Sequence, residues 1–176
     1  MIETKIAGLN LGSRNRAIPG FLNMDCDAHE GVDVVGDVSD LSRFADGAVG
    51  EIYASHVLEH FNFHRTAAVL KEWHRVLEPG GKLYVGVPDF QRALELYEVG
   101  GLNDWLIRFL MGDQEYATAY HYTLFDEARL ARLLKDAGFS DYFRVEQFPI
   151  GDENDCSNLA STIDGESVSL NVIATK

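Results

Sequence analysis

Short apolar segments alternate with segments of helical periodicity along most of the chain, and this alternation predicts an α/β domain. The apolar segments are expected to form strands at Ile6–Leu11, Phe21–Met24, Val32–Val35, Glu51–Ser55, Lys82–Val87, Tyr142–Phe148 and Ser167–Ala174. An acidic loop rich in Asn, Asp and Ser separates the last two segments, so we expect those two strands to pair in antiparallel fashion.

The clearest helical pattern lies within His64–Leu77. Leu70, Trp73 and Leu77 recur at i, i+3 and i+7, which places them on one face of a helix. Pro79 and the two glycines that follow it are expected to end this helix.

Residues 91–122 interrupt the alternation. Two short helices are predicted there, Gln91–Glu98 and Leu102–Met111, separated by a pair of glycines. After this segment Thr123 stands three residues before Asp126, a spacing typical of a capping box, and an amphipathic helix should follow and end at Gly138. We therefore expect a single domain over 1–176, with 91–122 as a helical insertion that caps an acceptor site.

The connections between the first three strands are unusually short. About nine residues separate the first strand from the second, and about seven separate the second from the third. A parallel crossover normally needs a dozen or more residues, so the first half of the sheet should be abbreviated. The overall prediction is a Rossmann-like open, mainly parallel sheet with an antiparallel C-terminal strand and helices on both faces.

Charge and composition narrow the choice of partners. The chain of 176 residues contains 15 Lys and Arg and 28 Asp and Glu, which gives it a net charge of −13. Such a surface repels phosphate backbones and anionic lipid, which argues against nucleic acid and membrane partners. Two cysteines, Cys26 and Cys156, form no disulfide framework, and no secretory signal pattern precedes the first strand, so a cytoplasmic location is expected.

Candidate binding residues gather where the predicted strands end. Gly12 and Ser13 follow the first strand, Asp25 the second, Asp37 the third, and Ser55 with His56 the fourth. In an open α/β sheet, ligands bind in the crevice beyond the carboxyl ends of the strands. The sequence therefore predicts one binding site at that edge.

Several of these segments resemble the class I S-adenosylmethionine-dependent methyltransferases, and in particular a small bacterial branch with a shortened N-terminal half. The segments that carry the resemblance are Leu9–Ser13, Asn23–Asp25, Gly36–Val38, Ser55–His60, Arg75–Leu83, Ala137–Phe139 and Ser169–Val172. Their order and spacing, more than any single segment, are specific for this family. The resemblance implies methyl transfer with S-adenosylmethionine as the cofactor.

The resemblance also implies a role for each strand end. Asp25 would accept hydrogen bonds from the ribose hydroxyls, Asp37 would accept from the adenine amine, and the Val38 N–H would donate to the adenine ring. The complete set of expected cofactor-binding residues is Asn10, Gly12, Ser13, Asp25, Cys26, Asp37, Val38, Ser55 and His56.

Two positions depart from the usual pattern. Arg14 stands where the family has the second glycine of a Gly-x-Gly loop, and Asn10 replaces an acidic residue that is more frequent there. The Arg14 guanidinium is expected either to pair with the methionine carboxylate of the cofactor or to hinder cofactor binding.

The acceptor side is less defined by sequence. His121, His60 and Asp89 are candidates for a catalytic base, and the acceptor is expected to be a small molecule or a saccharide hydroxyl. Aromatic residues that could line the acceptor site, or simply pack in a core, are Phe90, Tyr97, Trp105, Phe109 and Tyr116. The family pattern implies no metal.

Two alternatives remain open from the sequence. A binding module with the same fold that has lost catalysis would keep nearly the same motifs. His56, Glu59 and His60 also match the H-x-x-E-H pattern of one class of zinc hydrolase, although that chemistry needs a helix where a strand exit is predicted.

Overall fold

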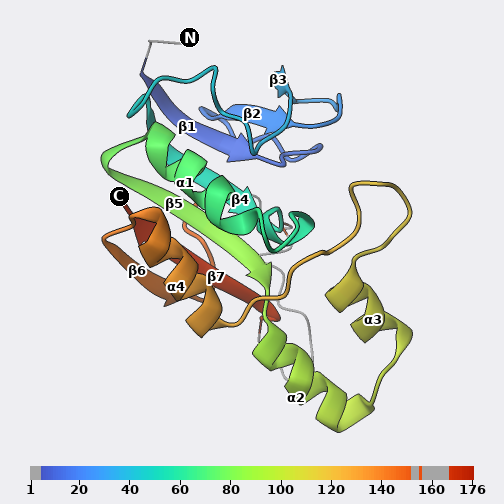
Figure 1. Ribbon diagram of the computed structural model, residues 1–176. Coiled ribbons are helices and arrows are strands. Elements are labelled where there is room, and N and C mark those ends of the chain that lie inside the picture. Colours follow the sequence, from blue (N-terminus) through green and yellow to red (C-terminus); the bar gives the residue numbers. More distant parts are fainter. Residues whose placement is uncertain (1–4, 152–154, 156–166) are drawn as a thin grey trace.

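The computed structural model describes residues 5–151, 155 and 167–176, which form one seven-stranded sheet with helices (Figure 1). The strands are β1 (Ile6–Leu11), β2 (Leu22–Asp25), β3 (Val34–Val35), β4 (Val49–Ser55), β5 (Leu77–Pro88), β6 (Asp141–Val145) and β7 (Ser169–Thr175). The helices are the short 3₁₀ helix η1 (Leu58–His60), α1 (Thr66–Val76), α2 (Phe90–Gly100), α3 (Asp104–Met111) and α4 (Glu127–Ala137).

The strand order across the sheet is β3-β2-β1-β4-β5-β7-β6. The first five strands are mutually parallel, and β7 lies antiparallel between β5 and β6. This arrangement confirms the mainly parallel Rossmann-like sheet and the antiparallel pairing of the last two predicted strands.

The abbreviated first half is also confirmed. Both β1 to β2 and β2 to β3 are parallel connections, yet neither contains a helix. Side-chain hydrogen bonds hold these short loops in place. The side-chain oxygen Oδ1 of Asn23 accepts from Asn10 Nδ2 at 2.9 Å and from the Ile18 N–H at 2.8 Å, and Asp33 Oδ2 accepts from the Asn23 N–H at 2.8 Å. A hydrogen-bonded chain of polar side chains, buried at Asn10 and Asn23, thus replaces the contacts that crossover helices would make.

The two faces of the sheet are covered differently. Helices α1 and α4 pack side by side on one face (Figure 1), over the buried side chains that alternate along the central strands. Tyr53, Tyr84 and Ile173 point to the opposite face, where they pack against Ile18 and Phe148 from loops. Helices were expected on both faces, but within the described residues this second face carries loop segments, because the short early connections have no room for helices.

Two element boundaries differ from prediction. Helix α1 ends at Val76 because β5 begins at Leu77, and Pro79 lies within that strand rather than behind a helix. Helix α4 is capped by Asp126, whose carboxylate accepts from the Arg129 N–H at 2.7 Å. The capping role expected of Thr123 is wrong, since its buried hydroxyl donates to the Phe61 carbonyl at 2.7 Å instead.

Helices α2 and α3 extend beyond the carboxyl ends of the strands (Figure 1). Asp89 caps α2 and Asn103 caps α3 through side-chain hydrogen bonds to backbone N–H groups. A small apolar cluster of its own, which includes Ala93, Leu96 and Leu106, holds the two helices together. In the described part of the chain, no helix has both the length and the apolar character that crossing a membrane requires.

The chain's two tryptophans provide a matched test of this core. Trp73 is 0% exposed and its indole N–H donates to the Val38 carbonyl at 2.9 Å, whereas Trp105 is 46% exposed and stacks on Phe109. We expect Trp73→Ala to lower the free energy of unfolding by about 3–5 kcal/mol and Trp105→Ala by no more than about 1 kcal/mol. Urea denaturation followed by circular dichroism measures both, and equal losses would contradict the assignment of the core.

Candidate functional site

The predicted strand ends meet at one edge of the sheet. The Gly12 N–H donates to the Met24 carbonyl at 2.8 Å, and the Gly36 N–H donates to the Asp25 carbonyl at 2.8 Å, so the first three strand exits lie in direct contact. Gly12 has φ +69°, and a Cβ there would lie 2.5 Å from Val57 Cγ2. Glycine is therefore required at this position both by backbone conformation and by space.

Arg14 keeps the backbone shape of the glycine it replaces. Its φ is +45°, in the left-handed region, and its N–H donates to Asp25 Oδ2 at 2.8 Å. The guanidinium lies over the Tyr116 ring, 5.3 Å from the centroid. The side chain thus turns toward the helical insertion.

Asp25 is buried and organises the loop after β2. Its Oδ2 accepts from Arg14, and its Oδ1 accepts from the Asp27 N–H at 3.0 Å. The neighbouring Cys26 thiol also lies near Asp25, with Sγ to Oδ1 at 3.4 Å. Partial desolvation of this thiol, together with the charges of Asp25 and Asp27, raises the pKa of Cys26 to about 11.

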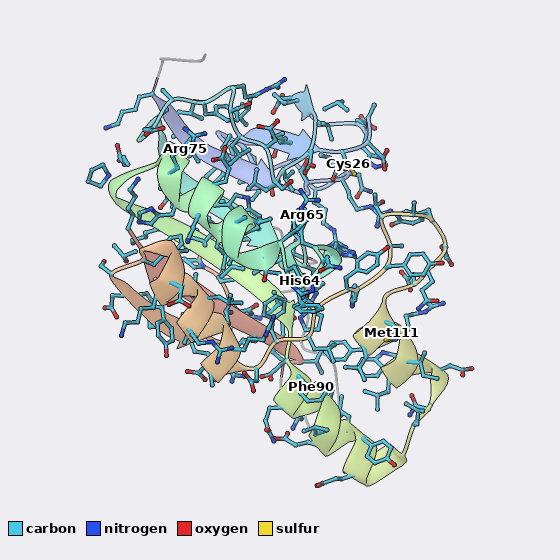
Figure 2. All side chains as sticks on the ribbon, viewed as in Figure 1. Cys26, His64, Arg65, Arg75, Phe90 and Met111 are labelled. Atoms are coloured by element: carbon cyan, nitrogen blue, oxygen red, sulfur yellow. The ribbon has the colours of Figure 1, made fainter. Side chains whose placement is uncertain are left out.

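Asp37 follows β3 at the same edge of the sheet and lies near Arg65, which is labelled in Figure 2. Its carboxylate is exposed, accepts from the Ser39 N–H at 2.8 Å, and lies 4.0 Å from Arg65 Nη2. Val38 is buried and its carbonyl is held by Trp73. A hollow of about 310 Å³ opens beside Asp37, lined also by Met24, Gly36, Asp40, Ser42 and Arg43.

Ser55 and His56 lie at the exit of β4. The Ser55 hydroxyl donates to the Asp155 carboxylate. His56 has φ +52°, with its Nε2 2.8 Å from Ser169 Oγ and its Nδ1 3.1 Å from Glu59 Oε1. Both ring nitrogens of His56 therefore have polar neighbours, which fixes the orientation of the ring.

Two of the three catalytic candidates meet in space. The rings of His60 and His121 have centroids 4.8 Å apart in an edge-to-face arrangement, although 60 residues separate them. His60 Nδ1 lies 3.0 Å from the Tyr120 carbonyl, and His121 Nδ1 lies 3.1 Å from the Phe109 carbonyl. The helical insertion thus brings His121 to the β4 exit.

Asp89, the third candidate, lies apart from that pair. It is buried, accepts from the Gln91 N–H at 3.0 Å as the cap of α2, and forms an ion pair with Arg144 at 2.9 Å. Its two oxygens are therefore both engaged in holding the start of the insertion.

Glu59 is the residue that the sequence analysis noted without giving it a role in the methyltransferase site. It is 0% exposed and lies beside three histidines, His56, His60 and His121. Burial acts to raise the pKa of Glu59, but the contact with His56 and the nearby imidazoles outweigh burial and lower it. Burial also lowers the pKa of His121. The H-x-x-E-H match was the sequence signal that singled out Glu59 and His60, but the helix that this motif implies does not include His56.

That geometry does not support the zinc hydrolase alternative. The class needs both histidines of the motif on one face of a helix. Here His56 precedes the short 3₁₀ helix in a left-handed conformation and directs its ring nitrogens to Ser169 and Glu59.

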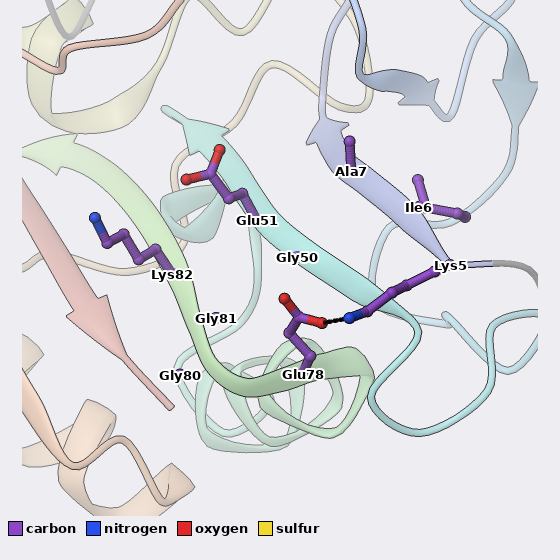
Figure 3. A pocket seen from close by; sticks show the side chains of 9 residues that line it. All are labelled: Lys5, Ile6, Ala7, Gly50, Glu51, Glu78, Gly80, Gly81 and Lys82. Carbon is purple, nitrogen blue, oxygen red and sulfur yellow. Dashed lines mark ion pairs between the residues drawn. The ribbon is translucent and has the colours of Figure 1, made fainter.

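A separate hollow of about 440 Å³ lies at the opposite edge of the sheet, where β1 and β4 begin (Figure 3). Three of its four charged side chains, those of Lys5, Glu51 and Glu78, have polar partners. Lys5 Nζ lies 2.5 Å from Glu78 Oε2, and Glu51 Oε1 accepts from the Tyr84 hydroxyl at 2.9 Å. This hollow is remote from the strand ends and contains none of the predicted site residues.

Comparisons with known proteins agree with this geometry. Residues 18–85 match the family model of the methyltransferase domain. A S-adenosylmethionine-dependent methyltransferase from Archaeoglobus fulgidus superposes with a TM-score of 0.62 at 15% identity, covering 99% of this chain and 87% of the other. One from Methanosarcina mazei gives 0.62 at 20% identity, covering 100% and 94%. Among curated proteins, none matches the sequence.

A third structure contains a bound cofactor product. The 1,6-didemethyltoxoflavin-N1-methyltransferase of Burkholderia thailandensis, solved with 1,6-didemethyltoxoflavin and S-adenosylhomocysteine, has a TM-score of 0.58 at 16% identity, covering 98% of this chain and 72% of the other. The fold is therefore that of the class I methyltransferases. The chain shares this fold, and the match of residues 18–85 to the methyltransferase domain, with S-adenosylmethionine-dependent methyltransferases.

The raised pKa of Cys26 gives a test of the environment at the β2 exit. Because the thiolate is the reactive form, a pKa of about 11 leaves Cys26 largely neutral at pH 8. We expect alkylation by iodoacetamide at pH 8 to be about tenfold or more slower than for an ordinary thiol, with the rate rising up to about pH 11.

Mass spectrometry of the peptide that contains Cys26 measures this rate separately from that of Cys156, which lies outside the described residues. Asp27→Asn removes one of the nearby charges and should speed the reaction at pH 8. A rate that levels off near pH 8.5 would show that the thiol has its ordinary pKa.

Proposed function

We propose that the chain transfers the methyl group of S-adenosylmethionine to a small-molecule or saccharide acceptor, with the cofactor at the carboxyl edge of β1 to β4. The observation that carries this proposal is the contact between the strand exits at Gly12, Asp25 and Gly36, beside a hollow that Gly36 and Asp37 line. Ligands of open α/β sheets bind at this edge.

Each expected cofactor contact has a physical basis. Each Asp25 oxygen accepts one backbone N–H, and Oδ1 also faces the Cys26 thiol. A carboxylate has about four lone-pair sites, so Oδ2 can accept from one ribose hydroxyl and Oδ1 from the other in place of the thiol. Asp37 is exposed at the hollow, where an adenine amine could donate to it. Asn10 and Ser13 are buried, and Asn10 supports the loop through its bonds to Arg16 and Asn23.

The acceptor is proposed to bind between the β4 exit and the insertion 91–122. Tyr120 and Tyr122 stack at 6.2 Å beside His121, and Trp105 stacks on Phe109, so aromatic surface is available on this side. We propose His60 and His121 as the residues that contact the nucleophilic atom of the acceptor. Asp89 is a weaker candidate, since its carboxylate holds α2 and Arg144.

The net charge of −13 bears on the choice of acceptor. Polyanions such as nucleic acid are repelled by a surface of this sign, and the same holds for anionic membranes. We therefore infer a neutral or cationic small acceptor, and a cytoplasmic site of action follows the sequence-based expectation.

The cofactor assignment predicts graded losses of affinity. Asp25→Ala removes two charge-assisted hydrogen bonds to the ribose and should weaken S-adenosylhomocysteine binding by about 100-fold. Asp37→Ala should weaken it by about tenfold. Asp136→Ala is the control, because Asp136 is an exposed carboxylate on α4, outside the hollow beside Asp37, and has no expected cofactor contact. Isothermal titration calorimetry measures all three, and an equal effect at Asp37 and Asp136 would contradict the proposed position of adenine.

The acceptor assignment predicts a different pattern for His121. His121→Ala should lower kcat by about 100-fold or more with a transferable acceptor, and should leave the Kd for S-adenosylhomocysteine within about twofold. His64→Ala, an exposed histidine near the start of α1, is the control and should change neither quantity. Loss of cofactor affinity in a folded His121→Ala protein would place His121 in the cofactor site instead.

A further inference from the structure

The environment of the Glu59 carboxylate is unusual. The side chain is 0% exposed, and neither oxygen has a hydrogen bond of ordinary geometry from any described residue. Its polar neighbour is His56, with Nδ1 3.1 Å from Oε1. Burying an ionised carboxylate is costly unless the charge is paired or coordinates a metal.

The two neighbouring imidazoles are oriented as metal ligands usually are. His60 Nδ1 faces the Tyr120 carbonyl and His121 Nδ1 faces the Phe109 carbonyl. A carbonyl only accepts, so each Nδ1 carries the hydrogen in the neutral ring and Nε2 keeps its lone pair. Histidines that bind metals almost always donate their other N–H to a carbonyl or a carboxylate in this way.

From this arrangement we propose that Glu59, His60 and His121 bind a divalent transition-metal ion. One ligand atom from each residue lies within 4.8 Å of the others. Donors bound to one ion at about 2.0–2.2 Å lie about 3–4 Å apart, so the three side chains need to close by on the order of 1 Å. Two imidazoles and one carboxylate suit Zn²⁺ and its neighbours better than Mg²⁺ or Ca²⁺.

The set differs from the hydrolase pattern considered above. His121 comes from the insertion and replaces His56 as a ligand, while His56 contacts Glu59 Oε1 through its Nδ1 at 3.1 Å. Three protein ligands leave a coordination position for an exogenous oxygen, as in catalytic zinc sites.

This position gives the ion a role that rests on the proposed function. An acceptor hydroxyl bound there would release its proton to solvent, because the ion lowers the pKa of the bound oxygen. That oxygen would then form a bond to the methyl carbon as the carbon–sulfur bond breaks, leaving S-adenosylhomocysteine. His60 and His121 would contact the nucleophile through the ion.

A second group of possible ligands, Asp25, Asp27 and His29, carries no comparable argument. Asp27 and His29 are exposed, and the Asp25 carboxylate already accepts two backbone N–H groups. That group therefore serves as a control in the test.

The test is direct titration of the intact protein, first stripped with a chelator, with Zn²⁺ by calorimetry and with Co²⁺ by visible absorption. We expect one tight site per chain and a Co²⁺ spectrum with nitrogen and oxygen ligands. Glu59→Gln and His121→Ala should each weaken binding by about 100-fold. His64→Ala and Asp27→Asn should bind as the wild type does.

The outcomes separate the two proposals. The metal site would be overturned if the wild type bound Zn²⁺ no more tightly than Glu59→Gln and His121→Ala do. It would also be overturned if only Asp27→Asn lost Zn²⁺ binding. His121→Ala is included in case Glu59→Gln fails to fold. His121 is only partly buried, so its replacement threatens folding less than a change at the buried Glu59. Methyl transfer that persists in chelated protein would reject the ion's role, whereas absence of cofactor binding with intact metal binding would reject the proposed function alone.

Discussion

The backbone carbonyl of Glu59 accepts hydrogen bonds from the N–H groups of both Tyr122, at 2.8 Å, and Thr123, at 3.2 Å. This pair of bonds joins the end of the insertion to the exit of β4. The Thr123 hydroxyl adds a third bond, to the Phe61 carbonyl. Because the chain passes from the insertion to α4 at this point, these bonds determine where His121 lies. The same bonds hold the Glu59 side chain in its buried place among the histidines. They therefore determine both where the insertion lies and which side chains surround Glu59.

The loss of early crossover helices imposes the second constraint. Without them, the carboxyl edge of β1 to β3 needs another source of rigidity. Hydrogen bonds of the buried Asn10 and Asn23 side chains, and of the exposed Asp33 carboxylate, provide it. A bond of this kind is worth on the order of 1 kcal/mol, but leaving any of its buried groups unpaired costs more. Asn10 is therefore suited to its place. An acidic residue there has no N–H to donate to Asn23.

Sequence periodicity predicted the elements closely, because local burial patterns dominate them. The strand Ile6–Leu11 was predicted with the bounds that the structure has, and the helix within His64–Leu77 contains α1. The capping role of Thr123 was wrong because its hydroxyl bonds to Phe61, a contact 62 residues away that no local pattern contains. The sequence could not predict that Glu59 lies beside His121, because that contact also joins residues far apart in the chain. The site residues at the strand ends could be proposed from topology alone, since parallel strands end at one edge.

Arg14 shows how a departure from a family pattern can still serve the site. A left-handed backbone costs a residue with a side chain about 1–2 kcal/mol relative to glycine. The bond from its N–H to Asp25 holds this conformation, and the guanidinium over Tyr116 returns about 0.5–1 kcal/mol. Asp25 and Tyr116 belong to opposite sides of the site, the proposed ribose contact and the insertion. Arg14 therefore links the proposed ribose contact to the insertion through one residue, with its guanidinium over Tyr116 and its backbone in the left-handed region.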